Sequence, residues 1–216
     1  MRALLRDVDG LLRGERDFAA GRGRIPWVRV ALCVASGGAL HGAALGSLHA
    51  RLDQMCVSAL KLPLLIASST ALCIPSFYAI NAVLGLREDF SAALRGVLAT
   101  QATVAVVLAS LAPIVALFSA SAIGYREAVA VDGALYCAAS VAGHVALARH
   151  YRPLIARRQR HAWARLAWLV LYWFVTIQLA WLLRPFVGAP GMPATFLRSG
   201  AWSNAYVVLT QAFLGS

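Results

Sequence analysis

Five stretches of this chain are each long enough, and apolar enough, to cross a lipid bilayer. About 20 consecutive apolar residues cross roughly 30 Å of hydrocarbon when they form a helix that rises 1.5 Å per residue. Inside lipid every backbone amide must be satisfied within its own segment, so these stretches are predicted to be helices. The fold predicted is therefore an all-α, polytopic membrane bundle with spans at 27–48, 60–84, 94–118, 128–148 and 163–183.

The composition agrees with a membrane environment. Hydrophobic residues make up 60% of the 216 residues and charged residues only 13%, and the mean hydropathy is +0.69. A soluble domain carries charge on about a quarter of its residues. The 20 basic residues outnumber the 9 acidic ones, but they lie in short segments between apolar runs. That placement indicates membrane topology and argues against a nucleic-acid-binding surface.

The basic residues alternate between the two sides of the predicted bundle. One side holds 14, all arginine, against five on the other: Arg51, Lys61, Arg126, Arg184 and Arg198; Arg29 lies just inside the first span. Because positive charge accumulates in cytoplasmic segments, the N-terminus is predicted to be cytoplasmic and, after five crossings, the C-terminus to lie outside. Lys61 is the single lysine, a bias that we attribute to a GC-rich bacterial genome. The predicted location is therefore the bacterial inner membrane.

The segments that flank the five spans are predicted to lie on the membrane surface. Residues 1–25 alternate leucines with arginines and acids at helical spacing, which favours a cytoplasmic amphipathic arm; a solvated arm is the alternative. Residues 26–185 form the predicted transmembrane bundle. Residues 186–216 begin with a turn rich in Pro and Gly, and polar residues interrupt the apolar run that follows. We expect an extracytoplasmic interfacial helix there, with a sixth crossing at 194–214 as the alternative.

The second span has an unusual entry. Residues 51–60 carry an apolar face at helical spacing, so an interfacial helix could precede the span and turn inward near Lys61 and Pro63. Pro63, Pro75 and Pro113 lie within spans, where each removes a backbone hydrogen bond and is expected to kink or locally unwind its helix.

A stripe of glycines marks the first span. Gly38, Gly42 and Gly46 recur every fourth residue, which allows a second helix to approach closely. Small-residue stripes are favoured packing faces in lipid, where hydrophobic burial between helices is weak. Packing within this protein is the first interpretation, and self-association through the stripe is the second.

Ionisable residues near the extracytoplasmic ends of the spans form the candidate functional cluster. They are His41, Lys61, Asp132 and Arg184. A charge within a span is costly and normally has a partner, so Asp132 is predicted to pair with Lys61, Arg184 or His41. A proton or cation site is one interpretation of this cluster. A static ion pair that fixes the bundle is the other, and the shallow position of Asp132 favours it.

Polar residues also occur toward the cytoplasmic side. Arg29, Asn81, Gln101 and His144 lie at similar depths within their spans, where they could form hydrogen bonds between helices or line a vestibule. The basic loop at 150–165 is expected to bind anionic headgroups, since each basic residue near such a surface contributes about 1 kcal/mol. The arginines proposed for this contact are Arg152, Arg157, Arg158 and Arg160.

Motifs for catalysis or metal binding are missing from the sequence. The four cysteines, Cys33, Cys56, Cys73 and Cys137, have neither CxxC spacing nor a matching His pattern, so they are read as small apolar residues. No HExxH, GxSxG or phosphate-binding loop occurs. The sequence therefore favours a protein that is not an enzyme and carries no cofactor.

One stretch resembles a known group of membrane proteins. Residues 58–86, SALKLPLLIASSTALCIPSFYAINAVLGL, together with LLRPFVG at 182–188, are similar to segments of bacterial Yip1-like and related multi-pass membrane proteins. The resemblance implies a five-helix membrane bundle with an accessory or scaffolding role. The long cytoplasmic domain often attached to Yip1 proteins has no counterpart in the sequence.

The function predicted from these features is that of a structural or accessory membrane subunit. It would assemble with itself or with another membrane protein, in contact with lipids that include anionic headgroups. The alternative is a small oligomeric channel or transporter for an ion or small solute, using the His41 and Asp132 region. A polar cavity that reaches both faces would favour transport, whereas a packed interior with an apolar outer groove would favour the subunit. A polar pocket with clustered acids and bases, open to the bilayer, would indicate a lipid-modifying enzyme.

Overall fold

The computed structural model describes residues 27–47, 51–121, 124–187, 194–197 and 204–207. Within these residues the chain is helical, without strands, and five long helices have the length and hydropathy of membrane spans. They are α3 (Trp27–Gly46), α4 (Leu52–Val83), α5 (Phe90–Ala120), α6 (Tyr125–Arg157) and α7 (Arg160–Leu183), with the short 3-10 helix η2 (Arg87–Asp89) before α5. The predicted all-α fold and five spans are confirmed. The predicted arm at 1–25 and most of the predicted segment 186–216 lie outside the described residues.

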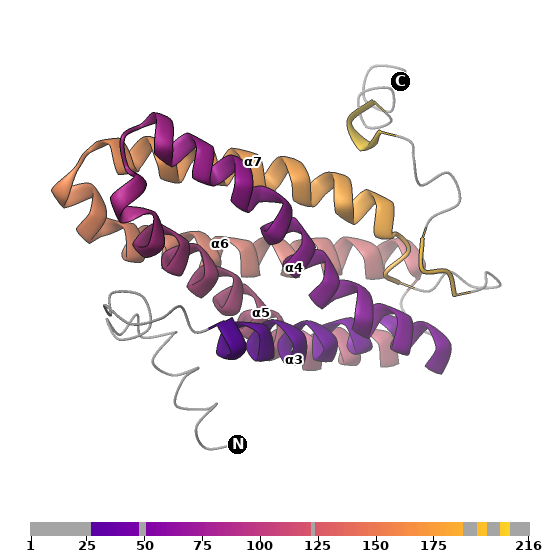
Figure 1. Cartoon of the computed structure of the whole chain (residues 1–216). Coiled ribbons are helices and arrows are strands. Elements are labelled where there is room, and N and C mark those ends of the chain that lie inside the picture. Colours follow the sequence, from indigo (N-terminus) through magenta and orange to yellow (C-terminus); the bar gives the residue numbers. More distant parts are fainter. Residues whose placement is uncertain (1–26, 48–50, 122–123, 188–193, 198–203, 208–216) are drawn as a thin grey trace.

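The helices pack as a layered bundle in which α6 and α7 are the least covered. Helix α3 packs against α4 and α5, and α6 packs against α5. Helix α4 runs obliquely across the bundle and contacts α7 (Figure 1). Helices α6 and α7 make sparse contact with each other. In the most apolar stretch of each span, 39 to 44% of residues are buried in α3, α4 and α5, against 11% in α6 and 17% in α7. Helices α6 and α7 therefore have fewer fully buried residues than the other three spans.

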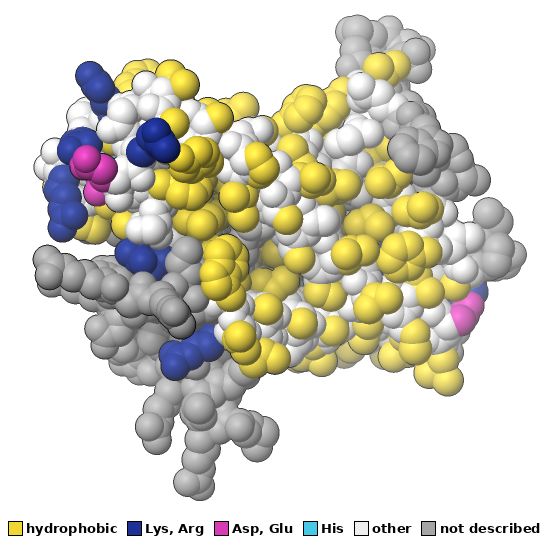
Figure 2. All heavy atoms as spheres, in the orientation of Figure 1, with side chains coloured by type: hydrophobic (Ala, Val, Ile, Leu, Met, Phe, Trp, Pro, Cys, Tyr) yellow, Lys and Arg dark blue, Asp and Glu magenta, His cyan; other side chains and the backbone are white. Residues whose placement is uncertain are grey.

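The two ends of the bundle differ in charge. Basic side chains gather at the end where α4 turns into α5 and α6 turns into α7 (Figure 2). A broad apolar band separates this end from the opposite one. We call the first the arginine-rich end, and the second, where α3 and α5 finish and α4 and α6 begin, the far end. This distribution matches the alternation of basic residues along the chain.

A helix-capping motif forms the turn at the arginine-rich end. Gly85 adopts a positive φ of 73° directly after α4, a conformation that glycine accepts without steric cost. The Leu86 amide donates to the Asn81 carbonyl at 2.8 Å, and the Gly85 amide donates to the Ala82 carbonyl at 3.1 Å. These two bonds satisfy carbonyls that the end of α4 would otherwise leave unpaired. The glycine therefore sets the reversal that leads into α5.

Helix α4 corrects the predicted entry to the second span. Residues 52–83 form one continuous helix, so the separate interfacial helix predicted at 51–60 is wrong. The reason is that Gln54, Ser58 and Lys61 are buried there, and their polar groups are satisfied within the protein. The helix also passes through Pro63 and Pro75 without interruption, as α5 does through Pro113, so the predicted local unwinding is absent from these helices.

An aromatic core closes the bundle toward the arginine-rich end. Phe77 of α4 lies 4.9 Å, between ring centroids, from Trp168 of α7 in an edge-on arrangement. Leu147 and Tyr151 of α6 belong to the same buried cluster. Aromatic pairs of this geometry contribute about 0.5–1.5 kcal/mol beyond their burial. The cluster joins four helices, α4, α5, α6 and α7.

Candidate functional site

A histidine and an aspartate meet near the far end. His41 of α3 is completely buried, and its Nε2 atom lies 3.3 Å from Oδ1 of Asp132 on α6. The Nδ1 atom of His41 lies 2.8 Å from the Leu108 carbonyl of α5. Because a carbonyl only accepts, Nδ1 carries a hydrogen, and the contact with Asp132 requires one further proton between the two groups. Of the three predicted partners of Asp132, the structure selects His41.

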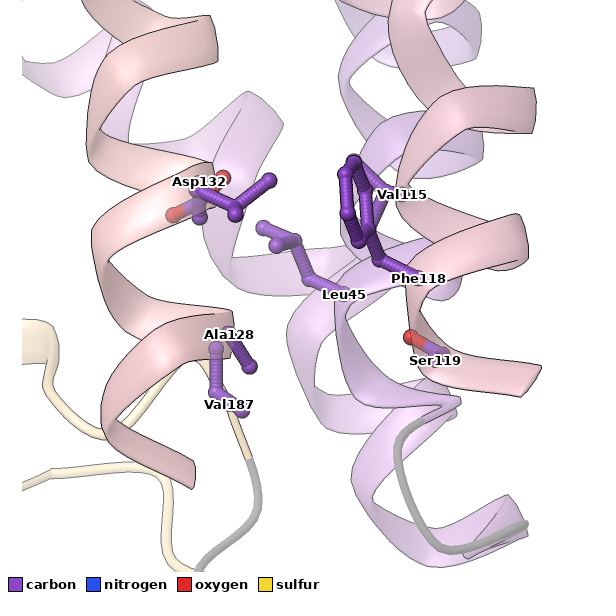
Figure 3. Close-up of a pocket in the computed structure, with 8 residues that line it drawn as sticks. Leu45, Val115, Phe118, Ser119, Ala128, Asp132 and Val187 are labelled. Carbon is purple, nitrogen blue, oxygen red and sulfur yellow. The ribbon is translucent and has the colours of Figure 1, made fainter. Parts of the chain in front are cut away.

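The space on the core side of Asp132 is small. Figure 3 shows Asp132 beside a cavity whose walls come from α3, α5 and α6, including Leu45, Val115 and Phe118. Its volume is about 10 Å³, and a cavity needs roughly 10–15 Å³ to hold a single water molecule. This cavity therefore has room for about one water, and none for a hydrated ion.

Lys61 occupies a separate site from Asp132. Its side chain is fully buried, and Nζ donates to the carbonyls of Pro185 at 2.8 Å and Thr195 at 2.7 Å. The ammonium also lies over the rings of Phe186 and Phe196, 5.9 and 5.8 Å from their centroids. Lys61 thus fastens the segment after α7 to α4, and among the described residues it forms no ion pair with Asp132.

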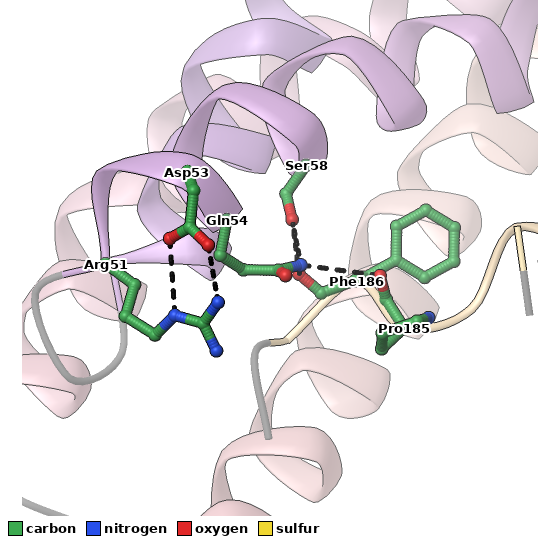
Figure 4. Close-up of polar contacts among 6 residues, drawn as sticks. All are labelled: Arg51, Asp53, Gln54, Ser58, Pro185 and Phe186. Atoms are coloured by element: carbon green, nitrogen blue, oxygen red, sulfur yellow. Dashed lines mark hydrogen bonds and ion pairs between the residues drawn. The ribbon is translucent and has the colours of Figure 1, made fainter. Parts of the chain in front are cut away.

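The start of α4 makes further contacts with the same segment. Gln54 Nε2 donates to the carbonyl of Phe186 at 3.2 Å, and Ser58 Oγ donates to that carbonyl as well (Figure 4). At the surface Arg51 pairs with Asp53. The hydrogen bond to Asp53 raises the pKa of Arg51 above its ordinary value, at which arginine is already charged at physiological pH. These contacts explain why the polar residues near the start of α4 belong to the same helix as the span that follows.

The main open feature is a groove between α6 and α7. Its volume is about 480 Å³, with walls from α6 and α7 and a floor from α4 and α5. Exposed lining residues include Val129, Gly133 and Cys137 on α6 and Trp173 and Ile177 on α7. Asp132 and Arg184 line the groove near the far end, and Leu147 and Trp168 line it toward the arginine-rich end. We call this feature the α6–α7 groove.

Two polar pairs connect the walls and floor of the groove. Tyr172 of α7 donates its hydroxyl hydrogen to Gln101 Oε1 of α5 at 2.9 Å. Trp173 Nε1 donates to His144 Nε2 of α6 at 3.0 Å, and the two rings stack with centroids 5.7 Å apart. Gln101 and His144 were predicted either to bond between helices or to line a vestibule. They form bonds between helices and also line the groove.

The other two polar residues predicted at this depth have local roles. Asn81 Nδ2 donates to the Phe77 carbonyl one turn earlier in α4, whereas its Oδ1 atom is buried without a recorded partner. Arg29 lies on α3 and is exposed. Neither residue lines the groove, so the four residues do not form one vestibule.

The glycine stripe of α3 packs inside the protein. A side chain at Gly42 would meet the Ser58 carbonyl of α4, and a Cβ at Gly38 would lie 2.9 Å from the nitrogen of Pro63. A Cβ at Gly46 would likewise meet Met55. The first of the two predicted interpretations is therefore correct: α3 uses this stripe to approach α4, and it is not available for self-association.

The arginine-rich end holds a second histidine–aspartate pair. His161 of α7 is fully buried, and its Nε2 lies 3.2 Å from Asp89 Oδ2 of η2. Arg158 donates to the Gly85 carbonyl at 3.1 Å, and Arg160 donates to the Leu84 carbonyl at 3.3 Å. Two of the four arginines predicted to contact anionic lipid therefore hold the α4–α5 turn. The other two, Arg152 and Arg157, are exposed on α6.

Sequence reasoning missed the contacts that depend on tertiary proximity. The binding of Gln54, Ser58 and Lys61 to carbonyls after α7 spans more than 120 positions. The Asp89–His161 pair was missed because both residues were assigned to loops between spans, where charged residues are ordinary, whereas His161 lies in α7. The concave shape of the α6–α7 groove has no sequence signal, since its lining looks like any apolar span.

These features define a multi-pass, all-α membrane protein with a packed interior and a groove at its surface. Among the residues described, no group of three His, Cys, Asp or Glu side chains could hold a metal ion. The chain matches no protein-family model, no curated protein and no solved structure. The resemblance to Yip1-like proteins therefore stays a prediction.

Proposed function

We propose that the protein is an accessory subunit that assembles, through the outer surface of α6, with a transmembrane helix of a second copy or of another membrane protein. The main support for this proposal is that α6 is the least buried span: only 11% of the residues in its most apolar stretch are buried. Its outer surface displays Ala130, Ala134 and Ala138 on successive turns, and all three are exposed. Small residues at this spacing let another helix approach closely in lipid.

The contrast with α3 supports this assignment. Both helices carry small residues at every fourth position, but those of α3 already contact α4, whereas Ala130, Ala134 and Ala138 face outward. Lipid chains alone could cover the surface, but they would gain nothing from its small residues. A helix would gain close packing along the whole stripe. The positive-inside rule places the arginine-rich end in the cytoplasm, and we propose the bacterial inner membrane as the location.

The structure supports the alternative, a channel or transporter, less well. Transport needs a polar path between the two faces. The cavity beside Asp132 has a volume of about 10 Å³, and buried apolar side chains, Leu147 and Trp168, line the larger groove toward the arginine-rich end. Among the described residues a single protomer therefore offers no continuous polar path, and a pore would have to form between copies.

Site-specific photo-crosslinking in native membranes tests the proposal. A benzophenone amino acid at Ala134 should give a discrete adduct with a protein, either a dimer of this chain or a second membrane protein. The matched control is Leu72, which is 59% exposed on α4 and should give lipid adducts alone. Ala134→Leu, placed beside a crosslinker at Ala138, should abolish the protein adduct. Lipid adducts alone from both Ala134 and Leu72 would overturn the proposed assembly.

A further inference from the structure

We infer that the α6–α7 groove binds one phospholipid with a primary ammonium headgroup, of the phosphatidylethanolamine type, in the leaflet at the far end. One of its two acyl chains would lie between the helices, and its headgroup would lie between Asp132 and Arg184. The site is distinct from the outer alanine stripe of α6, so it does not depend on the proposed assembly.

The shape and surroundings of the groove require an apolar occupant. It has a volume of about 480 Å³, within the range of 300–1,000 Å³ found for small-molecule sites. Its α6 wall runs from Val129 to Leu147, about 27 Å by helical rise, which exceeds the roughly 15 Å of hydrocarbon in one leaflet. An unfilled groove would forfeit dispersion contacts along this length. Because exposed residues line it, chains in the surrounding bilayer can enter.

Charge at the mouth of the groove identifies the headgroup. Arg184 is exposed just beyond the end of α7, and its guanidinium lies 5.3 Å from the Trp181 ring centroid. No acid lies within ion-pair distance of Arg184 in the part of the chain that is described. A guanidinium at this depth suits a lipid phosphate, which it can bind through two hydrogen bonds.

Asp132 supplies the complementary group. Its side chain is 23% exposed, and His41 contacts only Oδ1, which leaves Oδ2 to accept from a ligand. A primary ammonium carries three hydrogen-bond donors, as the lysine ammonium does. A quaternary choline headgroup has no N–H donor, and a glycerol headgroup has no positive charge. The pair of Asp132 and Arg184 therefore matches the ammonium and phosphate of phosphatidylethanolamine better than either alternative.

Native mass spectrometry of the full chain tests this site. The protein would be reconstituted in nanodiscs with equal amounts of phosphatidylethanolamine, phosphatidylcholine and phosphatidylglycerol, then released and analysed for retained lipid. The expected result is one retained phosphatidylethanolamine per chain, enriched about tenfold, the equivalent of one charge-assisted hydrogen bond. Asp132→Asn should remove the preference for phosphatidylethanolamine over phosphatidylcholine. Arg184→Gln should lower retention of all three lipids.

A variant that blocks the groove avoids any effect on the His41–Asp132 contact. A Cβ at Gly133 would have no atom within 4 Å, so Gly133→Leu should leave the fold intact and lower retention of every lipid. Ala134→Leu, on the outer stripe, should retain lipid normally while it abolishes the crosslinked assembly. The inference would be overturned if the three lipids were retained in the proportions present in the nanodisc, or if Gly133→Leu retained lipid normally. It would also be overturned if a crosslinker attached at Cys137, which lines the groove, captured a protein in place of lipid.

Discussion

The imidazole of His41 and the carboxylate of Asp132, 91 positions apart in the chain, approach to 3.3 Å between Nε2 and Oδ1. The contact joins α3 to α6, while Nδ1 of the same ring bonds to the Leu108 carbonyl of α5. A single buried side chain thus connects three helices near the far end.

Asp132→Ala should destabilise the protein because His41 then stays buried without its second partner. Hydrogen bonds between membrane helices contribute about 0.6 kcal/mol on average and up to about 1.7, so a loss of about 0.6–1.7 kcal/mol is expected. Asp132→Asn keeps an acceptor and should cost less. Thermal unfolding in detergent, followed by circular dichroism, measures both. Equal stability of Asp132→Ala and the unaltered protein would show that the pair does not fix the bundle.

The two glycines Gly42 and Gly133 should respond oppositely to alanine. A Cβ at Gly42 would meet the Ser58 carbonyl and lie 3.0 Å from Ala59 Cα, whereas a Cβ at Gly133 would meet nothing within 4 Å. Overpacking of this kind costs about 1–3 kcal/mol of stability. Replacing a helical glycine with alanine, where space allows, stabilises the helix by about 1 kcal/mol. Gly42→Ala should therefore lower the Tm, and Gly133→Ala should hold or raise it. Equal shifts for the two variants would contradict the packing of α3 on α4.

Lys61→Met should release the segment that follows α7. Methionine fills similar space but donates no hydrogen bond, so the carbonyls of Pro185 and Thr195 lose their charged donor. Hydrogen bonds to charged groups contribute about 1.5–3 kcal/mol, which corresponds to a rise of about tenfold or more in local opening.

Limited proteolysis by chymotrypsin at Phe196, with the protein in detergent, measures that opening. The control is Asp53→Asn, at an exposed pair with Arg51, where a surface ion pair is worth about 0–1 kcal/mol. It should leave the cleavage rate nearly unchanged. If Lys61→Met were cleaved no faster than the control, the fastening role of Lys61 would be refuted.

The fold was predictable from the sequence because each span must by itself be apolar and long enough to cross the hydrocarbon core of the membrane. Apolar length located α3 to α7, and the spacing of Gly38, Gly42 and Gly46 indicated a close helix contact. What could not be predicted was which helices meet. Depth alone made Lys61 one of three candidate partners of Asp132, yet it bonds to carbonyls after α7 because that segment folds back over α4. The α6–α7 groove likewise depends on the sparse contact of two helices, which no local pattern encodes.

The central claim is that α3 to α7 cross a membrane with the arginine-rich end in the cytoplasm. The direct measurement uses variants in which the four native cysteines are replaced by alanine and one new cysteine is introduced. Glu88→Cys reports the arginine-rich end, where Glu88 is 84% exposed, and Ser121→Cys reports the exposed far end of α5. In intact cells a membrane-impermeant maleimide should label Ser121→Cys, and should label Glu88→Cys only after the membrane is opened. Labelling of both positions from the same side of the intact membrane would contradict the account.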